Sequence, residues 1–160
     1  MSWRWNTKSA LILLHGESLA THGGGEGLRD VGLLDSALTR LLNLVPCADV
    51  NAPPDVAALS ASYTAGLAKT SPFIDGSKRA AFLATSLFLC LNSYRLEASQ
   101  ADATITMRAV DTGDITEDVF ANWLRLHIHI KLLKQAFNPM NTSATSYQKR
   151  IKRYFRTQSA

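Results

Sequence analysis

The apolar positions of the chain recur at helical spacing in six stretches, and clear strand-like alternation is hard to find. The fourth stretch is apolar on nearly every side from Ala80 to Leu91, which is typical of a buried helix. The predicted fold class is all-α, a compact helical bundle in which this fourth helix is central. The predicted helices cover residues 8–21, 31–43, 56–69, 77–92, 100–110 and a segment that begins after Thr116.

Polar residues and glycines mark where these helices begin and end. Asp30 and Asp55 precede the second and third helices, as N-cap residues do. The glycine-rich segment 22–27 ends the first helix. Ser71 precedes Pro72, and a residue before proline is pushed out of helical geometry, so the third helix must end there.

Composition excludes several classes of protein. The two cysteines lie far apart, and no group of His and Cys has the spacing of a zinc site. The first residues lack the features of a signal peptide, and no apolar run approaches the roughly 20 residues of a membrane span. We therefore expect a cytoplasmic protein with no membrane partner.

The basic residues are concentrated at the C-terminus. Residues 131–160 contain seven Lys and Arg and no acid, although the net charge of the chain is only +4. We therefore divide the chain into a domain over 1–137 and a polar linker with a basic tail over 138–160. The tail interleaves cations with aromatic residues, which fits binding to a nucleic acid or an acidic partner, although we favour a solvated terminus.

The segment SPFIDGSKR at residues 71–79 has the composition of a phosphate-binding loop. It leads into the fourth helix, and a helix N-terminus offers N–H donors and a positive partial charge. Gly76 lets the backbone approach a ligand, and Lys78 and Arg79 add cations where the helix dipole disfavours them unless an anion is present. Asp75 fits this arrangement if it holds a divalent cation that bridges phosphate oxygens.

The same residues also have a purely structural interpretation. Phe73 would pack inward, Ser77 would cap the helix, and Lys78 and Arg79 would be solvated. The segment alone leaves both interpretations open.

The segment resembles the signature of the Fic/Doc superfamily, His-x-Phe-x-(Asp/Glu/Asn)-(Gly/Ala)-Asn-(Lys/Gly)-Arg. HGGGEGLRDVGLLDSAL at residues 22–38 and LFLCLNSYRLEA at residues 87–98 resemble the family in the same order. The resemblance covers about residues 1–130 and is greatest to the death-on-curing (Doc) toxins. It implies a compact, mostly helical fold.

The resemblance also implies a role for each position of the loop. Family members bind ATP there, with Mg²⁺ held at the position of Asp75, and Arg79 corresponds to a catalytic residue that clamps a phosphate. The resemblance assigns the phosphate-binding loop to Phe73, Gly76, Ser77, Lys78 and Arg79. Fic enzymes transfer AMP to a protein hydroxyl, whereas Doc toxins phosphorylate elongation factor Tu and are bound by a Phd-type antitoxin.

Two positions depart from the signature. Ser71 stands where the family has its catalytic histidine, and Ser77 replaces the asparagine. A serine hydroxyl accepts no proton near neutral pH, whereas imidazole titrates there. We therefore expect a Doc-type toxin, an ATP-dependent modifier of protein hydroxyls, with impaired or altered catalysis. The alternative is an inactive member that binds nucleotide or antitoxin without turnover.

The four histidines are the residues that could replace the missing base. They are His15, His22, His127 and His129. For each of them we favour a structural role over a catalytic one.

Overall fold

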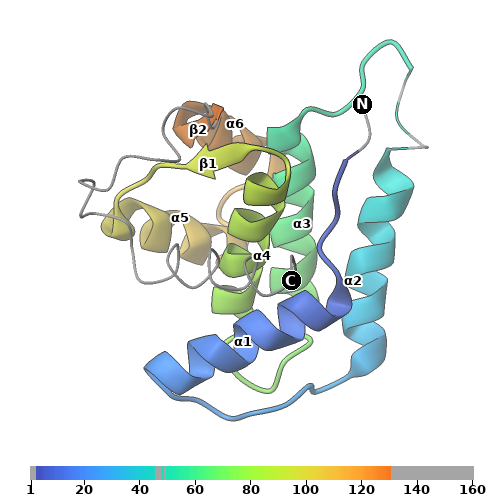
Figure 1. Cartoon of the computed structure of the whole chain (residues 1–160). Helices are drawn as coiled ribbons and strands as arrows, with labels where there is room; N and C mark the ends of the chain where they lie inside the picture. The colour runs from blue at the N-terminus through green and yellow to red at the C-terminus, as the bar shows by residue number, and fades with distance from the viewer. Residues whose placement is uncertain (1–2, 46–47, 49, 131–160) are drawn as a thin grey trace, which may run out of the picture. The chain divides into compact units, whose positions relative to one another are not determined.

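Six α-helices and one small two-stranded sheet make up the part of the chain that the computed structural model describes, residues 3–45, 48 and 50–130 (Figure 1). The helices are α1 (Lys8–His22), α2 (Val31–Leu44), α3 (Val56–Thr70), α4 (Ser77–Leu91), α5 (Gln100–Thr112) and α6 (Glu117–His127). The predicted all-α class is confirmed, and the predicted helices agree with these bounds to within about two residues.

The sheet was missed by the sequence analysis. β1 (Tyr94–Leu96) pairs with β2 (Ile128–Ile130), and just beyond this pair the Glu97 N–H donates to the His127 carbonyl at 2.8 Å. Strands of three residues are too short to give a recognisable alternation of apolar and polar positions.

Helix α3 shares the centre of the bundle with α4. Every residue of α3 from Val56 to Ala68 is buried except Ala58, and most of these residues are small, which lets neighbouring helices approach closely. The predicted burial of α4 is also confirmed, with Ala81, Ala84 and Phe88 fully buried. The core therefore has two adjacent central helices.

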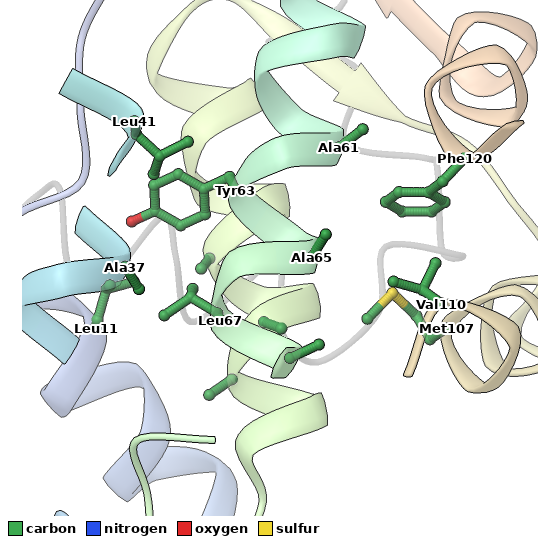
Figure 2. Close-up of a cluster of buried hydrophobic side chains, with 14 of the residues drawn as sticks. Leu11, Ala37, Leu41, Ala61, Tyr63, Ala65, Leu67, Met107, Val110 and Phe120 are labelled. Carbon is green, nitrogen blue, oxygen red and sulfur yellow. The ribbon is translucent and has the colours of Figure 1, made fainter. Parts of the chain in front are cut away.

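The side chains of α3 reach the core on both of its sides (Figure 2). Tyr63 points towards Leu41 of α2, whereas Ala65 faces the side where Phe120 of α6 and Met107 of α5 lie. α3 thus packs against α2 on one side and against α5 and α6 on the other. The C-terminal end of this central helix carries the loop at residues 71–76.

The helix boundaries follow from local chemistry. The side chains of Asp30, Asp55 and Thr116 each accept a hydrogen bond from an N–H group in the first turn of the helix that follows, as predicted for the first two. α3 ends at Thr70, and Ser71 adopts the left-handed conformation (φ 43°, ψ 60°) directly before Pro72. The predicted end of the third helix is confirmed.

The chain divides into a unit over Met1–His129 and a second unit over Ile130–Ala160. The predicted domain boundary after residue 137 and the basic tail at 138–160 both lie outside the described residues. Within the described residues, no helix combines the length and the apolar character that crossing a membrane requires.

Candidate functional site

The loop joining α3 to α4 lies against the loop joining α1 to α2 (Figure 1). Leu28 and Phe73 form an antiparallel bridge between the two loops, and the Ile74 N–H donates to the Gly27 carbonyl at 3.1 Å. Phe73 is only 3% exposed, so it anchors the loop to the core as predicted. The glycine-rich loop therefore lies directly against the loop that precedes α4.

The N-terminus of α4 differs from the other helix starts in the described residues. Gly76 occupies the N-cap position in the left-handed conformation (φ 71°), and no side chain caps the first turn. A side chain caps each of the other five helices. Ser77 is not the cap that the structural interpretation expected, because its hydroxyl bonds instead to the N–H (3.2 Å) and the carbonyl (3.3 Å) of Phe73.

The charged residues of the loop gather at this helix end. The Asp75 Oδ1 atom accepts a hydrogen bond from the Gly76 N–H at 2.5 Å. Arg79 donates from Nη2 to the Gly23 carbonyl at 3.1 Å, on the side of the glycine-rich loop. Lys78 forms an ion pair with Asp111 of α5, with Nζ and Oδ2 2.5 Å apart. The two cations are therefore not simply solvated, because each has an acceptor within the protein.

Ser71, at the position of the family histidine, is bound to the end of its own helix. Its hydroxyl donates to the Ala68 carbonyl at 3.0 Å, and its side chain is half-buried. A hydroxyl held in this way is no general base near neutral pH. The loop therefore brings N–H groups and two cations together at one helix end, but the residue at the position of the family histidine cannot take up a proton.

His15 contacts the loop directly. Its Nε2 atom is 2.6 Å from the Asp75 carbonyl oxygen, and its ring stacks on Phe73 with centroids 3.9 Å apart. The side chain is only 4% exposed, so it cannot reach a hydroxyl on another protein. His15 supports the loop from the core side.

The other histidines bond elsewhere. His22 Nδ1 donates to the Ser18 carbonyl of its own helix at 3.2 Å. His127 Nδ1 donates to the Trp123 carbonyl at 2.8 Å. Arg125, two residues before His127, pairs with Asp55 at the start of α3. The loop follows the other end of α3, about 22 Å away along the helix axis.

His129 faces Glu97 at 3.7 Å beside the sheet. None of the bonds described for His22, His127 or His129 places an imidazole at Ser71. The structural role favoured for these histidines is compatible with the bonds they make.

Asp75 is the residue that fits Mg²⁺. No cluster of three or more His, Cys, Asp or Glu residues that could hold a metal is found in the part of the chain that the structure describes. Mg²⁺ is commonly bound through one or two carboxylates together with phosphate oxygens and water. An exposed carboxylate beside a helix N-terminus is compatible with that pattern.

Sequence reasoning missed three contacts of the loop. Asp111 pairs with Lys78, Gly23 accepts from Arg79, and His15 supports Asp75. A signal existed only for His15, which lies four residues from both Leu11 and Leu19 and therefore shares their buried face of α1. The other two contacts join positions too distant in sequence for spacing to reveal.

Comparison with known proteins assigns this loop to a family. Residues 5–89, more than half of the chain, match the model of the Fic/DOC family. The chain belongs to the Fic/DOC family. It is also 30% identical over 115 residues to the protein named "Protein kinase doc" of Escherichia phage P1. The matched region covers 72% of this chain and 88% of the phage protein. The resemblance drawn from the loop and its flanking segments is thus confirmed.

Proposed function

We propose that this Fic/DOC chain is a Doc-type toxin that binds ATP at the N-terminus of α4 and modifies a protein hydroxyl at a reduced or altered rate. The observation that carries the proposal is the uncapped start of α4, where Asp75, Gly76, Lys78 and Arg79 lie together. N–H donors, a helix dipole and two cations at one point form an anion site. Similarity to the phage protein kinase supports a phosphate donor as the anion.

Each residue of the site has a distinct part in this proposal. Gly76 and the first turn of α4 donate N–H groups to phosphate oxygens, and Arg79 and Lys78 bind phosphate charge. Asp75 would hold Mg²⁺, which would neutralise charge on the phosphates when bound. The phosphoryl or AMP group would pass from ATP to a hydroxyl of a protein such as elongation factor Tu, leaving ADP or pyrophosphate respectively, and a Phd-like antitoxin would bind the toxin.

Ser71 determines how fast that transfer is. General-base catalysis contributes roughly 10² to 10⁴ in rate, and the Ser71 hydroxyl already donates to the Ala68 carbonyl. This contact favours the second candidate function, an inactive member that binds nucleotide or antitoxin without turnover.

The decisive experiment measures ATP–Mg²⁺ binding by calorimetry, together with label transfer onto a bacterial lysate from ATP labelled at either the α or the γ phosphate. It compares the natural chain with Ser71→His and Arg79→Ala. Histidine is among the residues that tolerate the left-handed backbone found at Ser71, so we expect this variant to fold. The label that is transferred shows whether the reaction is phosphorylation or AMP transfer.

Each result has a definite meaning. Transfer by the natural chain that Arg79→Ala abolishes supports an enzyme that works without the histidine. Transfer by Ser71→His alone supports a transferase that the serine has disabled. ATP binding with no transfer by either protein supports the second candidate, and failure of the natural chain to bind ATP refutes the proposal.

A further inference from the structure

His15 is a buried polar residue to which the family resemblance assigned no role. It lies on α1, about 60 residues away in sequence from the loop it contacts, and it is 4% exposed. Its Nε2 atom lies 2.6 Å from the Asp75 carbonyl oxygen. A carbonyl only accepts hydrogen bonds, so Nε2 carries the hydrogen, and the neutral Nε2–H form of the ring satisfies the contact.

The contact with His15 orients the peptide that joins Asp75 to Gly76. In a planar trans peptide the C=O and N–H groups point in opposite directions. Because the Asp75 carbonyl points inward to His15, the Gly76 N–H points outward, to the side where the exposed Asp75 side chain lies. That N–H already donates to an oxygen anion, Asp75 Oδ1, at 2.5 Å.

The ring of His15 holds the loop at a second point. It stacks on Phe73 at an interplanar angle of 15°, and Phe73 is itself 3% exposed. The left-handed Gly76 follows, where an added Cβ would lie 3.5 Å from His15 Nε2 and 3.2 Å from Arg79 Nη2. The His15 ring thus contacts both Phe73 and Asp75, the two ends of the segment 73–75 that leads to Gly76.

We propose that His15 is a positioning residue that aims the Gly76 N–H at the anion bound by this loop. The inference rests on the proposed function, because it requires an anionic ligand that accepts a hydrogen bond from the Gly76 N–H. His15 acts through the backbone and does not touch the ligand. A residue that only filled space would be replaceable by any apolar side chain of similar size, whereas a positioning residue must keep a donor at Nε2.

The test compares His15→Leu, which removes the donor, with His15→Gln, which keeps an N–H donor on a flexible chain. Leu11→Val serves as the matched control, because Leu11 is also buried on α1 and belongs to the hydrophobic core. Inorganic triphosphate with Mg²⁺ is the probe, measured by calorimetry. ¹⁵N NMR of the ligand-free proteins reports the tautomer of His15 and the amide resonance of Gly76.

We expect the Nε2–H tautomer in the natural chain and a shifted Gly76 amide in His15→Leu. His15→Leu should bind triphosphate about tenfold more weakly, as expected when a hydrogen bond to a charged ligand is weakened. His15→Gln and Leu11→Val should remain within about threefold of the natural chain. An Nδ1–H tautomer would overturn the inference, as would equal losses in the Leu and Gln variants or unchanged binding by His15→Leu.

The two proposals fail in different ways. If the natural chain binds no triphosphate but shows the Nε2–H tautomer and the Gly76 shift, the orientation stands and the proposed function falls. If His15→Leu does not fold, the tautomer of the natural chain and the affinity of His15→Gln still decide the matter. A weak His15→Gln with a normal melting temperature would then count against positioning by the donor.

Discussion

Gly24 faces Asp75 so closely that its replacement by alanine tests the architecture of the site. A Cβ at Gly24 would lie 2.5 Å from Asp75 Oδ2 and 2.9 Å from Leu19 Cδ2, and the backbone there has a φ of 129°. Gly113, the C-cap of α5, provides the matched control. It also has a positive φ, 78°, but an added Cβ would meet nothing within 4 Å.

The two substitutions share a cost in stability and differ at the site. A positive φ that favours glycine costs alanine about 1–3 kcal/mol, so both variants should melt at lower temperature. At Gly24 the Asp75 oxygen must also retreat by about 0.9 Å, from 2.5 Å to the ordinary contact distance of 3.4 Å. Because the carboxylate is exposed, it can rotate away, which disturbs its bond to the Gly76 N–H and the proposed hold on Mg²⁺.

We therefore expect Gly24→Ala to weaken binding of Mg²⁺-triphosphate about tenfold, whereas Gly113→Ala binds as the natural chain does. Calorimetry measures the affinities, and thermal melts measure the shared cost. Repeating the titration without Mg²⁺ separates the two effects of Asp75, because the difference between variants should shrink when no metal is present. Normal binding by Gly24→Ala, despite its lower melting temperature, would mean that Asp75 takes no part in binding.

Two further predictions concern ion pairs. The hydrogen bond from Arg125 holds the pKa of Asp55 below its ordinary value, so the pair stabilises the fold above the unfolded pKa and loses that effect as pH falls through the folded pKa. Arg125→Met should therefore lower the free energy of unfolding by less than about 1 kcal/mol near pH 7, because the pair is exposed. Well below pH 4 the loss should be smaller, because Asp55 is then protonated in the unfolded chain. An equal loss at both pH values in denaturant titrations would contradict the assignment. Asp111→Asn should release Lys78 and raise the affinity of the protein for triphosphate several-fold at low salt. Calorimetry across a salt series measures this affinity. If the affinity does not rise, the ion pair does not compete with the ligand.

Much of the fold could be predicted because its determinants are local. Asp55 caps α3 through the Ala58 N–H, and Pro72 forces the end of the same helix, and both effects operate within a few residues. The strands at 94–96 and 128–130 could not be predicted, because a three-residue strand is defined by its distant partner and not by its own pattern.

The site divides in the same way. The residues of the loop could be found from its composition and its resemblance to a family, and the structure places Asp75, Gly76 and Arg79 at one helix end. The groups that orient them come from elsewhere in the chain, such as His15 on α1 and Asp111 on α5. Such contacts depend on tertiary packing, which periodicity within one segment does not encode.

The two cations at the start of α4 are weaker evidence for a bound anion once their partners within the protein are known. From sequence, Lys78 and Arg79 indicated an external anion, because a helix N-terminus disfavours cations, and the alternative was that both were solvated. In the structure Lys78 is neutralised by Asp111, and Arg79 donates to a carbonyl. Cations alone therefore no longer demand a ligand, and a bound phosphate has to compete with Asp111 for Lys78. The case for an anion now rests more on the uncapped helix and the outward Gly76 N–H, which His15 orients, than on charge.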